Sequence, residues 1–490
     1  MESKYKSAFG KNDIRGIYGE DITEELFFNI GRGYVKYLNA ISGLEFNNMY
    51  ITVCMDARTH SPSLSSALQA GITSMKANVI DLGLAPTPIG YYSETVGVPY
   101  NLTNDNKITA ACIITASHNP KEYNGLKMTY NGKTLNEAQI KEVCDITLSE
   151  FTDDIKEPII SKIQKYNIIP DYIDDMVNKF GQIGKGVKVV VDSANATGGI
   201  VGPELYRKLG CDVVELFSEP DGTFPNHHPN PSVESTLDIL KSVVKSEKAD
   251  IGIAYDGDSD RIGIIDNLGG YLTGDKLLLI YALDIIPEYR SKGISPHIVS
   301  EVKCSQVLFD TIDRIGGKSH MCKTGHGYIK GMMQETGAIL AGEMSGHTFF
   351  KDRYYGFDDA IYAGCRIIEI ISKNKLRNPH FTIKDLLKPF DEVYTSSEVR
   401  YPCPNELKKS TLDMITKKVN DNKNIFGSVI KDIITLDGMR IVFDGGFALI
   451  RQSNTEPVFT LRFEAKSKDE CEHFKSVMCG LLDDILNAKV

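Results

Sequence analysis

Three closely spaced aspartates are the first candidates for chemistry in this sequence. Residues 254–261 read Ala-Tyr-Asp-Gly-Asp-Ser-Asp-Arg, so acidic residues alternate with small ones. In an extended backbone, this period-two spacing points the carboxylates of Asp256, Asp258 and Asp260 to one side. Three convergent carboxylates repel one another unless a cation lies among them, and carboxylate oxygens suit Mg²⁺. The segment therefore predicts a magnesium site.

The same acidic segment has two competing interpretations. An EF-hand loop needs glycine at its sixth position and glutamate at its twelfth. Those positions hold Arg261 and Asn267, which excludes an EF-hand. A solvated acidic turn without a metal ion stays open as an alternative. The apolar runs 251–254 and 262–265 predict strands on either side, with the aspartates on the loop between them.

A serine with basic neighbours is the second candidate. The apolar run 108–114 predicts a buried strand that stops at Thr-Ala-Ser, and the residues His-Asn-Pro that follow are turn formers. Ser117 is thus expected on a polar loop at the end of a strand, where ligands bind in open α/β sheets. With His118 beside it and Lys127 nearby, it has the parts of a nucleophile with proton-transfer groups. A plain turn with incidental basic neighbours is the alternative.

Three more polar segments have residue types that could contact a ligand. Residues 323–327, Lys-Thr-Gly-His-Gly, could contact a phosphate or move a proton. Residues 342–347, Gly-Glu-Met-Ser-Gly-His, offer acceptors and donors to a polyol. Residues 451–455, Arg-Gln-Ser-Asn-Thr, offer a guanidinium, hydroxyls and an amide to a phosphate dianion. Taken singly, each also fits a polar turn or a hairpin tip.

The elements that must position these residues follow a repeated order. Strand, helix and strand recur within 49–82, 187–217 and 297–322, which predicts parallel sheets with right-handed crossovers. We interpret them as three related α/β domains, although chance similarity of such units is a competing explanation. After a break near 388–389, two strands around the Asp-Gly-Gly turn at 444–446 predict an α+β domain.

Length and composition agree with several domains. At about 150 residues per domain, 490 residues give roughly three domains and accommodate four. The expected boundaries define four domains: 1–157 with the serine loop, 158–268 with the metal loop, 269–389 with the sugar-binding loop, and 390–490 with the phosphate-binding loop.

Charge and cysteine usage narrow the class of protein. A net charge of −10 argues against nucleic acid as a bulk partner. No apolar run is long enough to cross a bilayer, and residues 1–6 are polar and lack the hydrophobic part of a signal peptide. Ten scattered cysteines without metal-binding spacing suggest buried free thiols in a reducing compartment. We therefore expect a cytoplasmic enzyme without a membrane partner.

Taken together and in this order, these segments resemble the α-D-phosphohexomutase family, and its phosphomannomutase/phosphoglucomutase branch in particular. The resemblance spans nearly the whole chain. It implies three related α/β domains with mixed, largely parallel sheets and a smaller C-terminal α+β domain, arranged around a central cleft. One departure is Ser259, where glycine is commoner in the family.

The resemblance also implies roles for individual residues. Ser117 matches the phosphoserine, and the three aspartates match Mg²⁺ ligands whose site the seryl phosphate completes. Residues near the reacting phosphate form the catalytic set, together with His118: Arg15, Lys127, Arg261 and His326. Residues that contact the sugar or its second phosphate form the substrate-binding set: Lys303, Glu343, Ser345, His347, Arg451, Ser453, Asn454 and Thr455.

The hypothesis that follows is a phosphohexomutase. Phosphorylated Ser117 would donate its phosphoryl group to a hexose 1- or 6-phosphate, and a hexose 1,6-bisphosphate would turn round and return its other phosphate. The resemblance further implies that the Glu-Met-Ser sequence around Met344 favours mannose and glucose phosphates. Alternatives are a mutase for glucosamine or N-acetylglucosamine phosphate, a phosphatase, and a non-catalytic phosphosugar-binding protein. The partners expected are small phosphosugars, with the protein a monomer or homodimer.

Overall fold

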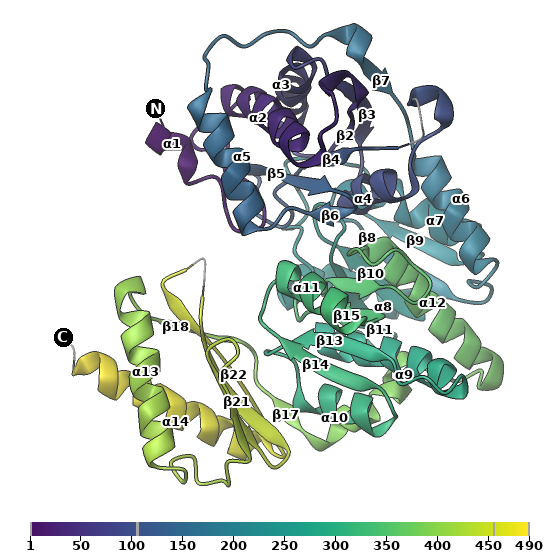
Figure 1. The fold of residues 1–490 in the computed structure, drawn as a ribbon. Helices are drawn as coiled ribbons and strands as arrows, with labels where there is room; N and C mark the ends of the chain where they lie inside the picture. Colours follow the sequence, from purple (N-terminus) through teal and green to yellow (C-terminus); the bar gives the residue numbers. More distant parts are fainter. Residues whose placement is uncertain (1, 104–106, 454–455, 489–490) are drawn as a thin grey trace. The chain divides into compact units, whose positions relative to one another are not determined.

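The structure is a computed structural model that forms two compact units, each described by itself below. It describes residues 2–103, 107–453 and 456–488. The first unit contains Met1–Leu272, Gly346–Thr348 and Tyr355–Thr382. The second contains Thr273–Ser345, Phe349–Tyr354 and Ile383–Val490. Four sheets follow one another along the described chain, and Figure 1 shows them with their helices.

The first sheet is mixed. Its order is β1-β5-β4-β2-β3-β7, with β6 beside β5; β2, β3, β4 and β7 are parallel, whereas β5 is antiparallel to β4 and β1. The strands are β1 Ile14–Ile17, β2 Tyr50–Met55, β3 Asn78–Leu84, β4 Ala110–Ile114, β5 Tyr123–Tyr130, β6 Lys133–Thr134 and β7 Ile163–Lys165. The helices nearby are α2 Glu24–Ser42, α3 Ser61–Ser74, α4 Thr87–Val96 and α5 Glu137–Ser149.

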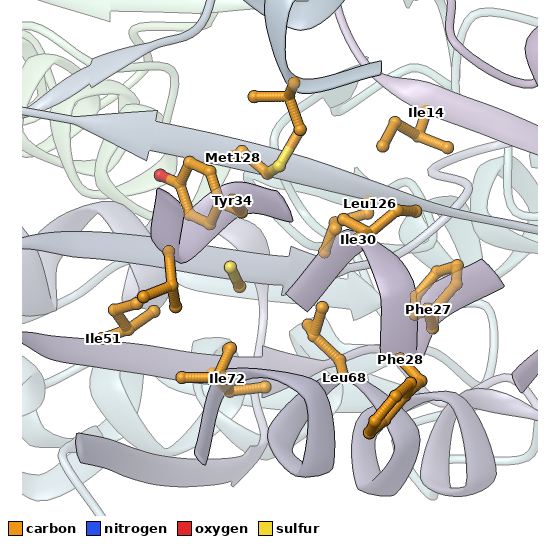
Figure 2. Close-up of a cluster of buried hydrophobic side chains, with 14 of the residues drawn as sticks. Ile14, Phe27, Phe28, Ile30, Tyr34, Ile51, Leu68, Ile72, Leu126 and Met128 are labelled. Carbon is orange, nitrogen blue, oxygen red and sulfur yellow. The ribbon is translucent and has the colours of Figure 1, made fainter. Parts of the chain in front are cut away.

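Helices cover both faces of this sheet. One face packs against α2 and α3, where Ile30 and Leu68 meet Ile51 and Leu126 of the strands (Figure 2). The other face carries α4, so the strands are buried from both sides and read as continuous apolar runs. At the crossing of α2 and α3 only glycine fits, because a Cβ on Gly71 would lie 2.0 Å from the carbonyl oxygen of Phe28.

The start of α3 differs from the expectation. The helix begins at Ser61 with proline in its first turn, as predicted. The Ser-Pro sequence at 61–62 favours Ser61 as the cap of this helix, and this expectation is wrong, because the N-cap residue is His60 and makes no side-chain cap bond. The Ser61 hydroxyl instead donates to Asp56 Oδ1 at 2.7 Å.

The second sheet also lies in the first unit. Its order is β12-β11-β10-β8-β9, with β8, β9 and β10 parallel and β11 antiparallel to β10. The strands are β8 Lys188–Asp192, β9 Asp212–Leu216, β10 Ile251–Tyr255, β11 Ile262–Asp266 and β12 Tyr271–Leu272. The helices that pack on the strands are α7 Gly202–Lys208, α8 Asp238–Ser246 and, from much later in the chain, α12 Ala360–Arg377, and α6 Ile169–Phe180 packs on α7 and α12.

The third sheet belongs mainly to the second unit. Its order is β14-β13-β15-β16, and β13 runs parallel to β14 and β15. The strands are β13 His297–Glu301, β14 Lys318–Cys322, β15 Leu340–Gly342 and β16 Thr348–Phe350. The helices are α9 Gly274–Ser291, α10 Gln306–Arg314 and α11 His326–Thr336. The sequence predicts a helix capped by Ser305, and the structure confirms it, because the Ser305 side chain accepts from the N–H of Val307 at the start of α10.

The fourth sheet completes the second unit. Its order is β17-β22-β21-β20-β19, with β18 beside β22, and α13 and α14 cover one face. The elements are β17 Tyr394–Thr395, β18 Val399–Pro402, α13 Asn405–Asp421, β19 Asp432–Ile434, β20 Met439–Phe443, β21 Gly446–Gln452, β22 Val458–Ala465 and α14 Lys468–Asn487. The expected hairpin is confirmed, and Gly445 has the positive φ of 81° that its turn requires. This sheet confirms the expected α+β character of the C-terminal part.

Two expectations about the chain as a whole can be compared with these elements. The cysteines form no disulfide among the described residues, and nine of the ten are buried. Within the same ranges, no helix has the length and apolar character to span a bilayer.

Candidate functional site

The loop after β4 brings Ser117 to the acidic segment. Ser117 is buried and has a left-handed backbone with φ 50°, which is uncommon for a residue with a side chain. Its N–H donates to Thr115 Oγ1 at 2.8 Å. The Ser117 hydroxyl lies 2.8 Å from Asp256 Oδ2 and 3.1 Å from His118 Nδ1. Two segments far apart in the sequence, each chosen for its residue types, therefore meet at one oxygen atom.

The acidic loop passes close to the serine backbone. A Cβ on Gly257 would lie only 2.4 Å from the carbonyl oxygen of Ser117. No side chain fits there without moving one of the two loops. Glycine at this position is what lets Asp256 reach the serine hydroxyl.

The three aspartates converge through a turn, so the extended backbone expected from their spacing is wrong. The N–H of Ser259 donates to the carbonyl of Asp256 at 3.2 Å, and Ser259 has a φ of 59°. This left-handed conformation favours glycine, which is the residue that the family resemblance leads us to expect at position 259. The carboxylate oxygens of the three aspartates still lie within 4.8 Å of one another and are buried.

The acidic group fits a hard cation. Among the described residues, the buried oxygens Asp258 Oδ1 and Asp260 Oδ1 have no hydrogen-bond partner. Lys127 lies beside them, with Nζ 2.6 Å from Asp258 Oδ2 and 2.5 Å from Asp260 Oδ2. Burial disfavours the charge on Lys127, but the two carboxylates outweigh it and raise its pKa. Burial and the neighbouring Asp260 and Asp258 raise the pKa of Asp256. An all-oxygen set with unsatisfied acceptors suits Mg²⁺.

Basic groups surround the serine loop. Arg15, on β1, donates to Asn119 Oδ1 at 2.9 Å and forms an ion pair with Asp13. His118 is held neutral, because burial and then the charges of Arg261 and Arg15 lower its pKa. The first unit thus gathers the predicted serine, its proton-transfer candidates and the metal ligands.

His347 also lies in this first unit. It was predicted in the substrate-binding set, and the structure places its Nε2 3.0 Å from Arg261 Nε, which donates to it. Its Nδ1 lies 3.3 Å from Asp358 Oδ2 and 3.7 Å from Asp260 Oδ1. These three residues are a second group that could hold a metal ion. The aspartate triplet fits Mg²⁺ better because it offers only oxygen ligands.

The second unit carries Lys303 in an acidic setting. Lys303 Nζ lies 3.6 Å from Glu301 Oε1 and 3.6 Å from Glu398 Oε2. Burial opposes the charge on Lys303, but these two glutamates raise its pKa, so the ammonium is charged at neutral pH. Glu301 also accepts from the N–H of Met344 at 2.9 Å, which joins the Lys303 segment to the predicted sugar-binding loop.

The other predicted loops of this unit meet through two carboxylates. Glu343 Oε1 accepts from the N–H of Gly325 at 2.9 Å, and the Ser345 hydroxyl lies 3.4 Å from Glu343 Oε2. Asp437 Oδ2 accepts from the N–H of Thr324 at 3.1 Å and from Arg451 Nε at 3.0 Å. The segment 323–327, the glutamate loop and the arginine are therefore neighbours, with His326 at the start of α11.

The last predicted loop is described only in part. Ser453 Oγ accepts from the N–H of Glu456 at 3.2 Å, and Lys408 Nζ donates to the Ser453 carbonyl at 2.8 Å. Asn454 and Thr455, also predicted to bind phosphate, lie outside the described residues.

Comparison with known families covers nearly the whole chain. Four models of phosphoglucomutase/phosphomannomutase match in order: the alpha/beta/alpha domains I, II and III at residues 6–153, 170–269 and 273–390, and the C-terminal domain at 398–480. The chain belongs to the phosphoglucomutase/phosphomannomutase family. The expected family, the fold class and the assignment as an isomerase are confirmed.

Individual members of this phosphoglucomutase/phosphomannomutase family agree. A phosphomannomutase/phosphoglucomutase of Pseudomonas putida is 36% identical over 477 residues, covering 96% of this chain and 94% of that protein. A phosphoglucomutase of Neisseria gonorrhoeae is 34% identical, covering 97% of this chain and 96% of that protein. A crystal structure of a family protein from Burkholderia thailandensis has a TM-score of 0.84 at 32% identity, covering 98% of this chain and 97% of that one.

Four residues of this phosphoglucomutase/phosphomannomutase chain were missed by sequence reasoning. Asp358 and Asp437 orient His347 and Arg451, as described above. Thr87 holds the metal loop, because its hydroxyl donates to Asp258 Oδ2 at 2.5 Å and its N–H to the Asp258 carbonyl at 2.8 Å. Arg58 contacts the serine loop. Each acts on a segment distant in sequence, so no local pattern reveals it.

Proposed function

We propose that this protein interconverts hexose 1-phosphate and hexose 6-phosphate through phosphorylated Ser117 and a hexose 1,6-bisphosphate. Mannose and glucose are the hexoses proposed, in keeping with the names of the relatives. One observation carries the proposal: the buried Ser117 hydroxyl lies 2.8 Å from an aspartate of the acidic triplet. A nucleophilic oxygen beside a candidate cation site is what phosphoryl transfer requires.

The proposed step conserves the phosphoryl group. A free hydroxyl of the sugar attacks the phosphorus on Ser117, the new sugar–phosphate bond forms, and the bond to Ser117 Oγ breaks. The sugar hydroxyl loses a proton and the serine oxygen gains one. His118 Nδ1 lies 3.1 Å from that oxygen, so the neutral imidazole can share a hydrogen bond with the Ser117 hydroxyl, while its lowered pKa keeps the proton on the oxygen. Reversal with the other phosphate of the bisphosphate regenerates phosphoserine and completes the isomerisation.

Charge at the site decides which residues stabilise and which move protons. Lys127 is fully charged because its pKa is raised, so we assign it to stabilising the phosphoryl group rather than to accepting a proton. Arg15 and Arg261 share this role. Asp256, Asp258 and Asp260, with a phosphoserine oxygen, would hold Mg²⁺. Mg²⁺ supplies positive charge against the transferring phosphoryl group.

We assign sugar and phosphate recognition to the second unit. The charged Lys303 and Arg451 suit a phosphate dianion, and Glu343 and Ser345 suit sugar hydroxyls. His326, Ser453, Asn454 and Thr455 complete the proposed set, and His347 of the first unit joins it. Glu301 is paired with Lys303, and Asp437 accepts a hydrogen bond from Arg451, which supports an orienting role for these two carboxylates.

A mutase for amino-sugar phosphates is the second candidate. A protein of Methanosphaera stadtmanae named probable phosphoglucosamine mutase is 31% identical over 484 residues and covers 98% of this chain and 98% of that protein. The identity of this protein to the chain, 31%, is close to the 36% of the Pseudomonas putida phosphomannomutase/phosphoglucomutase.

Initial rates with four sugar phosphates separate these candidates. Mannose 1-phosphate, glucose 1-phosphate, glucosamine 1-phosphate and N-acetylglucosamine 1-phosphate are compared with Mg²⁺ and catalytic hexose 1,6-bisphosphate. The proposal expects 6-phosphates from mannose or glucose, and a phosphoryl group on the peptide that contains Ser117 by mass spectrometry. Preference for amino sugars would favour the second candidate. Release of inorganic phosphate at the rate of isomer formation, or the absence of any turnover, would contradict a mutase.

A further inference from the structure

A buried arginine lies beneath the serine loop. Arg58 follows β2 and is only 1% exposed. Its guanidinium lies 5.4 Å from the ring of Phe224, and Gly222 comes so close that a Cβ there would lie 2.2 Å from the carbonyl of Ala57. The segment around 222–224 therefore seals Arg58 from solvent. A charge buried in this way needs a full set of partners.

The guanidinium has partners for all its donor nitrogens. Asp56 accepts from Nε at 3.1 Å and fixes the orientation of the plane. The other acceptors are four backbone carbonyls of the serine loop. They are Ser117 at 2.9 Å and Asn119 at 2.7 Å from Nη2, and Pro120 at 2.6 Å and Tyr123 at 3.0 Å from Nη1.

These bonds bear on the position of the reacting oxygen. Ser117 holds a left-handed conformation, which persists only where surrounding structure enforces it. Arg58 anchors the carbonyl of Ser117 itself, and three more carbonyls on its C-terminal side. Thr115 anchors the N–H of Ser117 at 2.8 Å. With both ends of that residue fixed, the direction of its Cα–Cβ bond is set, and the hydroxyl lies within reach of Asp256 and His118.

We propose that Arg58 is the positioning residue of the serine loop: it sets the geometry of phosphoryl transfer without touching the substrate. The inference rests on the proposed function of Ser117 as the phosphoryl carrier. Only a planar guanidinium can serve four carbonyls and a carboxylate, since an ammonium has three donors at a single point. Lysine is therefore not an equivalent substitute, although it keeps the charge.

The first test is Arg58→Lys, compared with Arg366→Lys. Arg366 is an equally buried arginine of the first unit that contacts Tyr362 and Glu369 on α12. Because a displaced nucleophile lowers the rate of the chemical step, we expect kcat of Arg58→Lys to fall about 100-fold. KM for the sugar phosphate should change less than about threefold, since other residues bind it. Arg366→Lys should lower the melting temperature while kcat stays within about twofold.

A second variant keeps the test valid if Arg58→Lys folds poorly. Arg58→Ala leaves a space lined by carbonyls, into which guanidinium ion fits. Millimolar guanidinium chloride should restore kcat of Arg58→Ala at least about tenfold, with no effect on the wild type or on Arg366→Ala. A residue that served stability alone would not show a rescued kcat at temperatures where the variant is folded.

Hydrogen exchange separates this inference from the proposed function. The amides of Ser117, Asn119 and Tyr123 are hydrogen-bonded, so the peptide spanning 115–125 should exchange slowly in the wild type and at least tenfold faster in Arg58→Lys. That readout needs no substrate. Unchanged exchange with unchanged kcat in Arg58→Lys would overturn the role of Arg58. Absence of mutase activity in the wild type, with faster exchange in the variant, would overturn the proposed function alone.

Discussion

The serine loop and the Lys303 segment are both held by buried arginine side chains. The arginines differ in how far along the sequence they lie from the segment that they hold. Each follows a strand of a parallel pair, and each is fixed through backbone carbonyls by buried arginines. Arg58 follows β2, which lies beside β4 in the same sheet, and β4 leads into the serine loop. The Lys303 segment is held by Arg440, which donates to the carbonyls of Val302 and Cys304, and by Arg462, which donates to the carbonyl of Lys303. These two arginines lie on β20 and β22 of the fourth sheet.

This difference shows which parts of the chain each of the two segments depends on. The serine loop takes its four carbonyl hydrogen bonds from an arginine beside its own sheet, and outside that sheet it needs the bare backbone of Gly257. The Lys303 segment owes its shape to residues more than a hundred positions away. The Arg440 guanidinium is buried 3.6 Å from the centre of the Phe447 ring. It can hold the Lys303 segment only while the fourth sheet packs on the third. Substrate recognition is therefore the more vulnerable of the two functions.

Removing the nucleophile of the serine loop should have the largest effect, because it abolishes chemistry and leaves recognition by the second unit intact. Ser117→Ala removes the oxygen that carries the phosphoryl group, so we expect mutase activity to fall at least about 10⁴-fold. Binding of glucose 1-phosphate should stay within about threefold, because other residues are assigned to recognition. Calorimetric titration and coupled-enzyme rates measure the two quantities. Residual activity above one per cent would mean that another group carries the phosphoryl.

Arg440→Lys tests the Lys303 segment in the same way that Arg58→Lys tests the serine loop. It weakens the hold on the Lys303 segment, so we expect KM for sugar phosphates to rise about tenfold, with kcat reduced less than about threefold. This is the reverse of the pattern expected for Arg58→Lys. Steady-state kinetics of both variants provide the measurement. A fall in kcat alone would show that the two regions do not divide binding and chemistry as proposed.

Glu94 offers a pH-dependent test of the first sheet. Its carboxylate accepts from the N–H of Gly132 at 2.8 Å and from Thr129, and burial raises its pKa to about 7. The folded protein therefore keeps a proton that the unfolded chain loses near pH 4.3, so stability falls as pH rises between about 4.3 and 7.

Glu94→Gln cannot ionise and should escape this loss. We expect its free energy of unfolding to exceed that of the wild type by about 1–3 kcal/mol at pH 8, with little difference at pH 4. Urea unfolding at the two pH values measures it, with the exposed Glu142→Gln as control. Equal stabilities at pH 8 would place the pKa of Glu94 near its ordinary value.

The smallest expected effect is at the metal loop. Ser259 is left-handed, and its buried hydroxyl has no hydrogen-bond partner among the described residues. Ser259→Gly removes both features and should raise stability by about 1 kcal/mol without changing kcat. Ser66→Gly, at an exposed position in the interior of α3, should lower stability by about 0.5–1 kcal/mol. Thermal melts of both variants decide, and a destabilised Ser259→Gly would refute the explanation of this departure.

Local patterns predicted the elements and several chemical groups, but not the contacts that assemble them. The strand before Ser117, the cap at Ser305 and the hairpin at Gly445 follow from nearest neighbours along the chain. The aspartates were found by type and spacing, although a turn rather than an extended strand brings them together. Arg58 is one arginine among many in the sequence, and only folding shows that four carbonyls converge on it. Likewise, α12 follows the third sheet in sequence, yet it packs in the first unit.

The close approach of Gly257 to the carbonyl of Ser117 has a consequence for recombination between relatives. That carbonyl is pressed between a bare backbone on one side and a guanidinium on the other. If the first α/β segment is replaced by that of a relative, the serine loop keeps its conformation only when the rest of the chain has glycine at position 257. Arginine, serine and glycine thus form an inherited set, and a crossover between residues 58 and 257 breaks it whenever the two parents differ there.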